Sequence, residues 1–528
     1  MSSDRSLRKH FSIDSIESDD NIQVDQNYDT LFTSQNSLSN RNRNDLDAYT
    51  LNYRIIKTTL LIFAWISFGL NLEIIGPTFE DLKIYLQVNY SSISFALVLR
   101  NIGYLILTIL FGLVLDKYSK YSETLMSIAS AVIAISNFLM PITRNYLIQI
   151  FYFLFQGLAQ AIYDLGGNYI ILNLWSSVNT SPINAMHAGY GMGAILATQM
   201  AKQFIKFDPY HTNSTLTISN TTSLILKSSD INLKTPYWIA SLIALIISVL
   251  FYLSQIIETK NRLKYEHNRK QLILLSEEFN LDDASIGTSS SLIETKMSNV
   301  IKKMFLGKDK LNNLTQNQLN LILIQIVLFI IVFVFNQGYF TILSRFMITY
   351  LTIGPARLDV EIFIIIQTLF WAFFIVGRFL AAYLAFKFDT IKFFMWVLIG
   401  NFMVTILFLI PFLTEFKIFF WIGVSLLGLC SGPITPTGIM LAKQLLDINS
   451  FVLSLFIVGL AGGGIIFQQL TGALLDFYEP NKTSWMGFSQ ANSAFILPHL
   501  ASIASFLCLS FFVPIYLIHR KIFNFYRK

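Results

Sequence analysis

The chain has 528 residues, of which 54% are hydrophobic and only 13% are charged. An average soluble domain carries about 25% charged residues, so this composition excludes a soluble protein and predicts an all-α membrane protein that crosses the bilayer several times. The net charge of +6 could point to nucleic acid in a soluble protein. Here the basic residues lie mostly in loops and termini, where they orient a protein in the lipid bilayer, and no nucleic-acid partner is expected.

The first 50 residues are rich in Ser, Asn and Asp and show no helical or alternating hydrophobic period. Such a segment cannot bury enough apolar surface to fold. Residues 1–50 are therefore predicted to be a disordered cytoplasmic tail.

Two sets of six apolar segments follow, each near the roughly 20 residues that a helix needs to cross a bilayer. The expected spans are 55–77, 91–115, 122–141, 146–173, 183–206 and 236–257, then 318–344, 360–386, 391–413, 417–442, 450–475 and 491–518. They predict a six-helix bundle at 51–257, a polar basic linker at 258–317, a second bundle at 318–518 and a basic cytoplasmic tail at 519–528. A duplicated set of six helices is typical of secondary transporters.

The linker and the short loops on its side carry most of the loop lysines and arginines. The positive-inside rule places that side, with both termini, in the cytoplasm. Asn-X-Ser/Thr sequons can be glycosylated only on the opposite, non-cytoplasmic side. Four sequons fall in loops on that side, at Asn89, Asn213, Asn220 and Asn481, so a glycoprotein is predicted. Those at Asn179 and Asn313 fall inside and are read as chance matches. The plasma membrane is the default expectation, although an intracellular membrane would glycosylate the same loops.

A polar stripe runs along the predicted helix at 146–173. Gln156, Gln160, Asp164 and Asn168 recur every four residues, and such positions share one helical face. A carboxylate there should face the bundle interior or a water-filled cavity. It could carry a proton, help to hold a cation, bind solute hydroxyls, or only hold helices together. Gln160, Asp164 and Asn168 are candidate substrate-binding residues, and Asp164 is also a candidate for coupling.

On the next predicted helix, Asn184, His187 and Gly191 share a face at spacings of three and four. A neutral imidazole can relay a proton or contact a sugar hydroxyl. A histidine near a helix start can equally be an interfacial residue. His187 is therefore a coupling or gating candidate with that alternative open.

Arg100 and Arg378 lie inside apolar runs, where an unpaired guanidinium is expensive. Each needs a partner. Asp164 and Glu73 are the candidates for Arg100, and carbonyl groups at the C-terminus of a neighbouring helix are the candidates for Arg378. Both arginines are predicted to act in coupling or gating.

The second half offers further polar groups at membrane depth. Gln337 and Trp371 are candidate substrate-binding residues, because pockets for sugars use amides for hydroxyls and an aromatic ring for the apolar sugar face. Trp371 could equally be a packing residue. The Gly, Pro and Thr run at 432–437 must break regular helical hydrogen bonding, which is tolerated only where protein or a cavity satisfies the backbone.

No phosphate-binding glycine loop, zinc-spaced His/Glu set or nucleophile elbow is found in the sequence. An enzyme is therefore not expected, and no catalytic residue or metal ligand is predicted. Cys430 and Cys508 lie in apolar runs and are expected to pack rather than to form a disulfide.

Several short motifs, taken in chain order, resemble the sodium-dependent glucose transporter-like branch of the major facilitator superfamily, which is related to fucose permeases. The run from Asp164 to Asn168 (DLGGN), the run from Leu172 to Trp175 (LNLW), and His187 with the run from Gly189 to Gly193 (GYGMG) resemble its fourth and fifth helices. Elsewhere the resemblance rests on Gly76-Pro77-Thr78, Arg100 with Gly103-Tyr104, Gln337-Gly338-Tyr339, Phe370-Trp371, Gly377-Arg378 and Pro436-Thr437. The loop GLVLDKYSK is a degenerate form of the superfamily's Gly-X-X-X-Asp-Arg signature, and its Asp116 with Lys117 is expected to form a cytoplasmic gate or lock.

The resemblance implies two pseudo-symmetric six-helix bundles around a central cavity, alternating access without ATP hydrolysis, and a small polar solute such as a hexose. It marks Asp164, Asn168, His187 and Gln337 as positions to watch. No cofactor is implied beyond a possible coupling sodium ion or proton, and a monomer is expected. The alternatives are facilitative transport without a coupling ion, transport of a non-sugar solute, or a non-transporting receptor or scaffold whose tail and linker recruit partners.

Overall fold

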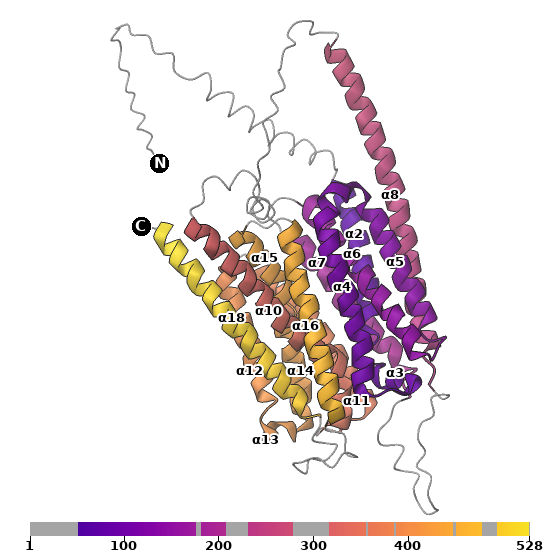
Figure 1. Ribbon diagram of the computed structural model, residues 1–528, viewed down its shortest axis with the longest axis vertical. Coiled ribbons are helices and arrows are strands. Elements are labelled where there is room, and N and C mark those ends of the chain that lie inside the picture. The colour runs from indigo at the N-terminus through magenta and orange to yellow at the C-terminus, as the bar shows by residue number, and fades with distance from the viewer. Residues whose placement is uncertain are drawn as a thin grey trace, which may run out of the picture. The chain divides into compact units, whose positions relative to one another are not determined.

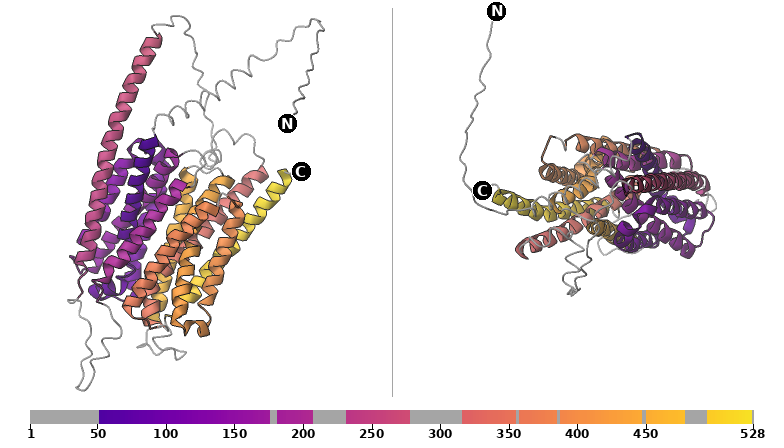
Figure 2. Two further views of the ribbon diagram at one scale, coloured as in Figure 1. Left: turned by 180° about the vertical axis from the view of Figure 1, so that it is seen from behind. Right: turned by 90° about the horizontal axis from the view of Figure 1, so that it is seen from above.

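The computed structural model describes residues 51–175, 181–206, 231–277, 316–354, 357–384, 387–446, 450–477 and 494–526. Residues 55–528 form one compact unit, and the description below concerns that unit. Its described residues form helices and short turns, arranged as two bundles side by side (Figures 1 and 2).

Among the described residues, the N-terminal bundle contains six long α-helices and one short α-helix. They are α2 (Leu51–Glu73), α3 (Phe79–Leu86), α4 (Tyr90–Tyr118), α5 (Ser122–Leu139), α6 (Tyr146–Leu174), α7 (Ser181–Lys202) and α8 (Lys234–Glu277). The end of the bundle at which α2 begins and α8 ends is called the linker side below, and α3 lies at the opposite side (Figure 1).

The C-terminal bundle repeats this pattern within the described residues. Its elements are α10 (Gln316–Ile348), α11 (Val360–Leu384), α12 (Thr390–Leu407), α13 (Pro411–Thr414), α14 (Lys417–Ser431), α15 (Ile434–Leu446), α16 (Ser450–Phe477) and α18 (Ile496–Tyr526). A π-helical turn, Thr349–Ile353, follows α10. The elements α14 and α15 form one span that is interrupted at residues 432–433, as the Gly, Pro and Thr run predicts.

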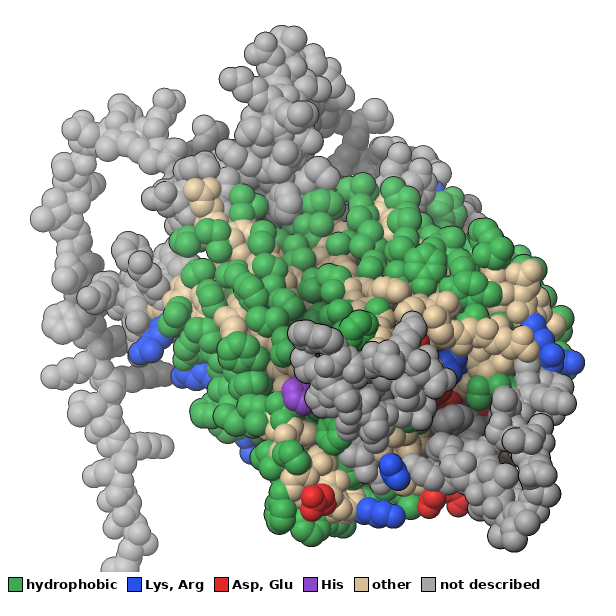
Figure 3. All heavy atoms as spheres, turned by 60° about the horizontal axis from the view of Figure 1, so that its bottom comes forward, with side chains coloured by type: hydrophobic (Ala, Val, Ile, Leu, Met, Phe, Trp, Pro, Cys, Tyr) green, Lys and Arg blue, Asp and Glu red, His purple; other side chains and the backbone are tan. Residues whose placement is uncertain are grey.

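Eleven helical spans in the described part of the chain are long and apolar enough to cross a membrane. The twelfth long helix in the described part of the two bundles is α7, whose polar residues include Asn184, His187 and Gln199. Hydrophobic side chains cover most of the face seen in Figure 3, and some charged side chains lie at the end opposite the linker, which is turned toward the viewer. The predicted fold class, an all-α membrane protein with twelve spans in two bundles, is confirmed.

Some boundaries differ from the sequence expectation. The helix α8 runs on to Glu277, so the first part of the expected linker continues a membrane helix. Similarly, α18 runs to Tyr526, into the expected tail. The predicted disordered tail at 1–50 and every sequon except Asn89 lie outside the described residues; the Asn89 side chain is exposed on the side opposite the linker.

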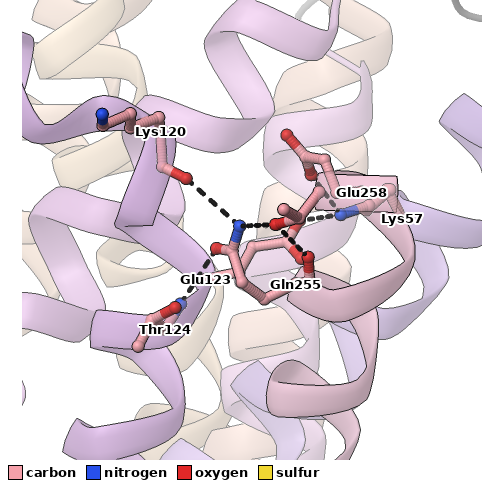
Figure 4. A network of polar contacts seen from close by, with 7 residues as sticks. Lys57, Lys120, Glu123, Thr124, Gln255 and Glu258 are labelled. Atoms are coloured by element: carbon pink, nitrogen blue, oxygen red, sulfur yellow. Dashed lines mark hydrogen bonds and ion pairs between the residues drawn. The ribbon is translucent and has the colours of Figure 1, made fainter. Parts of the chain in front are cut away.

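A buried polar network ties three helices of the N-terminal bundle together at the linker side (Figure 4). The Lys57 ammonium on α2 pairs with Glu123 on α5 and, over 2.8 Å, with Glu258 on α8. Gln255 on α8 accepts from the Thr124 amide and donates to the Lys120 carbonyl. These bonds cross between α2, α5 and α8 and so hold the three helices together at this end of the bundle.

The two bundles meet along two seams. One seam is formed by α4 and α16 and the other by α7 and α11. Glycine allows close approach in the first seam, since a Cβ at Gly472 on α16 would lie 2.2 Å from Oγ of Ser94 on α4. The space between the seams is the place for a site that both bundles build.

Candidate functional site

A polar cavity with a volume of about 120 Å³ lies between the two bundles. At the roughly 30 Å³ that a water molecule occupies in the liquid, this is room for about four water molecules. From the N-terminal bundle its lining includes Trp65, Phe68, Leu72, Asn101, Tyr104, Gln160, Asp164, Asn168, His187 and Tyr190. From the C-terminal bundle it includes Asn336, Gln337, Phe340, Phe374, Arg378, Ser431, Thr435, Ile439, Ile457 and Leu460.

Asp164 is the carboxylate of this cavity, and its own bundle holds it in place. The Tyr104 hydroxyl donates to its Oδ2 over 2.6 Å. One turn further along α6, the amide of Asn168 donates to the Asp164 backbone carbonyl, and its Oδ1 lies 3.1 Å from Nε2 of His187. Three predicted site residues from two helices therefore form one connected group, which can accept or donate hydrogen bonds toward a solute.

Arg378 supplies the positive charge of the cavity. Its Nε donates over 3.0 Å to the carbonyl of Gly432, the residue that caps the C-terminus of α14, which is the type of partner expected from the sequence. Its Nη1 donates to the backbone carbonyl of His187 in the other bundle, and its guanidinium lies 4.2 Å from the Phe374 ring centroid. Arg378 thus holds α11 against α7 across the seam on the linker half of the cavity.

Aromatic rings form the apolar part of the cavity wall. Phe68 stacks on Tyr163 at 4.8 Å between centroids, and its edge meets Tyr190 at 5.8 Å. On the opposite wall Phe340 packs against Phe374. Aromatic faces beside amides and one carboxylate are the combination that binds the apolar face and the hydroxyls of a sugar ring.

On the side opposite the linker, a buried ion pair joins the bundles. Glu73 at the end of α2 accepts from Arg345 on α10, with Nη1–Oε2 at 3.0 Å and Nη2–Oε1 at 3.1 Å. Arg345 also donates to the Leu72 carbonyl, and the Tyr190 hydroxyl donates to Oε1 of Glu73. Since Tyr190 also lines the cavity, this ion pair is one side chain away from the solute space.

Further hydrogen bonds close the same side. Asp476 at the end of α16 accepts from the backbone amides of Tyr90 and Ser91 at the start of α4, at 2.9 and 2.6 Å. The Thr349 hydroxyl donates to Glu80 over 2.6 Å. The bundles are therefore in contact at the end opposite the linker, and the cavity is separated from that end.

The structure does not bring all predicted residues to the cavity. Trp371 is fully buried beside it and packs against Phe340, Phe370 and Phe374, which is the packing alternative noted above. Gln156 points into the N-terminal bundle, where it donates to Asn137 over 2.7 Å. Of the four polar residues of the stripe on α6, Gln156 therefore faces its own bundle, whereas Gln160, Asp164 and Asn168 line the cavity. Asp116 lies in α4, but its side chain, like that of Lys117, lies outside the described residues.

Arg100 is the predicted residue whose expected pairing is not found. It is 5% exposed, and its Nε and Nη1 have no hydrogen-bond partner among the described residues. Both expected partners are engaged elsewhere, Asp164 by Tyr104 and Glu73 by Arg345. The ion pair that does form joins the two bundles, which the sequence cannot place side by side.

Several cavity residues were missed from the sequence. Asn101 is a polar residue beside Arg100 in an apolar helix, and Tyr190 lies inside the GYGMG run. Both could therefore have been predicted from the sequence. Trp65 and Phe68 could not have been predicted from the sequence, because an aromatic residue in an apolar helix faces lipid or packs against other helices as often as it lines a cavity.

Two bundles of six membrane helices with a polar cavity between them define a membrane protein of the carrier type. The family model described as Major Facilitator Superfamily matches residues 61–468. The chain belongs to the Major Facilitator Superfamily.

Curated relatives include Sodium-dependent glucose transporter 1 of Homo sapiens, 30% identical over 143 residues, which are 27% of this chain and 27% of that protein. Sodium-dependent glucose transporter 1A of Mus musculus is 29% identical over 36% of this chain and 46% of its own length. The matches thus span less than half of these first relatives. Major facilitator superfamily domain-containing protein 4B of Danio rerio is 22% identical over 81% of this chain and 82% of its own length.

Solved structures share the fold. A single-residue variant of the fucose:proton symporter FucP of E. coli aligns with a TM-score of 0.53 at 15% identity, covering 87% of this chain and 99% of that one. A single-residue variant of the nucleoside transporter NupG aligns with a TM-score of 0.54 at 13% identity, covering 86% of this chain and 98% of that one.

Proposed function

We propose that the protein carries a small polyhydroxylated solute, in the first place a hexose, across its membrane by alternating access. The observation that carries the proposal is the cavity wall, where one carboxylate and several amides lie opposite aromatic rings. The relatives named as sodium-dependent glucose transporters support the same solute class, as does the match of motifs on α6 and α7.

Five residues are proposed to build the solute site, four by direct contact and one by packing behind the cavity wall. Gln160, Asp164, Asn168 and Gln337 would take hydroxyl groups, and Trp371 would act from behind the wall by fixing Phe340 and Phe374. Asp164 is also the proposed coupling group for a sodium ion or a proton, because a lone cavity carboxylate can alternate between charged and neutral, or between ion-bound and free, as the cavity opens to each side.

Gating is assigned to residues at the cavity borders. His187 and Arg378 are proposed to close the linker half, Arg100 to act at the opposite half, and Asp116 to act at the end of α4. The linker side is proposed to be cytoplasmic and the host membrane to be the plasma membrane, with the protein working as a monomer that needs no cofactor other than the coupling ion.

The test is uptake of labelled hexoses into vesicles that contain the purified protein, with and without sodium and with and without a pH gradient. Saturable uptake that is driven by one of the two gradients is expected. The Asp164→Asn variant is expected to bind solute but to lose accumulation. Absence of saturable flux for every hexose refutes the sugar proposal, and unchanged accumulation by the variant removes Asp164 as the coupling site.

A receptor or scaffold would need no solute in the cavity. A cysteine in place of Asn168 tests this difference, since a bound solute protects that position from a thiol reagent in a transporter. The matched position is Met192 on α7, which is 37% exposed and is not part of the cavity lining, so the same solute should leave a cysteine there unprotected.

A further inference from the structure

Arg100 occupies a position that the static contacts do not explain. It lies on α4 in the N-terminal bundle, is 5% exposed, and leaves Nε and Nη1 without hydrogen-bond partners among the described residues. A buried guanidinium without a hydrogen-bonded anion costs several kcal/mol, by order of magnitude. Arg100 lies one turn before Tyr104 on the same face of α4. Tyr104 lines the cavity together with Tyr190, whose hydroxyl donates to Glu73, and the charges of Arg345 and Glu73 both act on Arg100.

Glu73 therefore lies at the same border of the cavity as two arginines, Arg100 and Arg345. In the arrangement described here, both of its oxygens bind Arg345, which belongs to the other bundle. Tyr190 adds a third hydrogen bond from its own bundle. Glu73, Tyr190 and Arg100 all belong to the N-terminal bundle, whereas Arg345 belongs to the C-terminal bundle.

We propose that Glu73 exchanges partners during transport, with Arg345 bound when the side opposite the linker is closed and Arg100 bound when that side opens. This inference rests on the proposed alternating access. When the bundles part, Arg345 moves away with α10 while Arg100 stays in the same bundle as Glu73. Arg345 then faces incoming water, and Arg100 supplies the hydrogen-bonded cation that a carboxylate at this depth requires.

Two electrostatic effects of Arg100 act in the same direction. In the closed arrangement Arg100 repels Arg345, because like charges in a low-dielectric interior repel strongly. In the open arrangement Arg100 attracts Glu73, which has lost its other partner. Both effects favour opening, so Arg100 offsets the Glu73–Arg345 pair, which favours closure. Arg100 is in this sense a positioning residue that sets the balance between the two arrangements.

The experiment measures how often the side opposite the linker opens. Ser94 on α4 is fully buried at the seam with α16, so a thiol introduced by Ser94→Cys is reached only when the seam parts. The background carries Cys430→Ser and Cys508→Ala, which remove both native thiols. The full-length protein in lipid nanodiscs is reacted with a soluble maleimide, and the modification rate is followed without any solute.

The Arg100→Gln variant is expected to lower the modification rate by about tenfold, while Arg100→Lys, which keeps the charge, stays close to the background. Arg345→Gln is expected to raise the rate. Arg520→Gln, on an exposed part of α18, is the matched control that removes an arginine elsewhere. An unchanged or raised rate in Arg100→Gln overturns the proposal, and the opposite response of Arg345→Gln shows that the assay can detect a shift.

A second comparison tests whether Glu73 mediates the effect. In a Glu73→Gln background the effect of Arg100→Gln should shrink, because only the repulsion between the arginines remains to be removed. An equal effect in both backgrounds shows that Arg100 acts without Glu73 and overturns the exchange. Because the maleimide experiment uses no solute, a result that contradicts the exchange of Glu73 partners does not contradict hexose transport. In the same way, absence of hexose uptake does not contradict the exchange.

Discussion

The hydroxyl of Tyr104 on α4 donates a hydrogen bond to Oδ2 of Asp164 on α6 over 2.6 Å, and both side chains line the central cavity. The bond fixes the direction of the carboxylate without neutralising its charge. It leaves Oδ1 for a solute hydroxyl or a coupling ion. Tyr104 is thus part of the proposed binding group although the sequence points first to Asp164.

Removing this hydroxyl tests the arrangement. Tyr104→Phe keeps the ring in the cavity wall but frees the carboxylate to rotate, and a hydrogen bond to a charged group contributes about 1.5–3 kcal/mol. We expect solute uptake at low concentration to fall by about tenfold or more, mainly through a higher KM. The measurement is the concentration dependence of uptake in vesicles.

Tyr252→Phe is the control for this prediction, since the Tyr252 side chain is 56% exposed on the lipid-facing part of α8. It removes the same group far from the cavity. A fall in uptake of equal size in both variants would contradict the role given to Tyr104.

A second prediction concerns the link between the bundles at Arg378. Arg378→Lys keeps the positive charge but cannot hold the Gly432 and His187 carbonyls in the same planar fork. The contact of α11 with α7 should loosen, and a cysteine placed at Gln337 in the cavity should react faster with a thiol reagent by about tenfold. Arg520→Lys is the matched variant outside the cavity. An unchanged rate would show that Arg378 does not close the linker half.

Much of this architecture follows from residue pattern. The twelve spans follow from hydropathy, because lipid admits only helices or closed barrels. The break between α14 and α15 follows from Gly432 and Pro433. Gln160, Asp164 and Asn168 reach the cavity together because their spacing of four keeps them on one face of a single helix.

Contacts between helices far apart in sequence could not be predicted in this way. Glu73 and Arg345 were both visible as charges near span ends, yet their pairing depends on how α2 and α10 meet across the bundle interface. Trp371 shows the same limit, since helical spacing puts it near Gln367 but only the packing decides whether its ring faces the cavity or the aromatic cluster beside it.

A third prediction tests close packing inside the N-terminal bundle. A Cβ added at Gly157 on α6 would lie 1.8 Å from the backbone oxygen of Arg100 on α4, a clash with backbone that cannot be relieved by a side-chain rotation. Gly157→Ala should lower the thermal midpoint, since overpacking typically costs about 1–3 kcal/mol. The readout is the temperature at which the purified protein loses its monodisperse size-exclusion peak.

Gly462 provides the comparison, because the nearest atom to a Cβ there is Cγ2 of Val334 at 3.8 Å, an ordinary contact. Gly462→Ala should leave the midpoint unchanged or raise it slightly, since alanine favours a helix over glycine by about 1 kcal/mol. Equal effects of the two substitutions would mean that α4 and α6 can move apart at no cost, against the geometry described.

The last prediction concerns the network of Lys57, Glu123 and Glu258 at the linker side (Figure 4). Lys57 and Glu123 are 6% and 4% exposed, so Lys57→Met leaves a buried carboxylate without its cation, a change that costs about 3–5 kcal/mol when no other partner takes over. A marked fall in the thermal midpoint is expected. Lys417→Met, on an exposed part of α14, should change it little.

The double variant Lys57→Met with Glu123→Leu distinguishes a lost charge pair from lost packing. Replacing both partners of a buried pair by apolar groups is often neutral, so the double variant should regain most of the stability that Lys57→Met loses. If the double variant is as unstable as the single one, the network contributes through its fit with Gln255 and Glu258 rather than through the ion pair. This end of the bundle would then depend on α8 keeping its position. An internal deletion of residues 261–277, which keeps the second bundle in the chain, should not reproduce the loss, because the hydrogen bonds between α8 and α5 lie before residue 259.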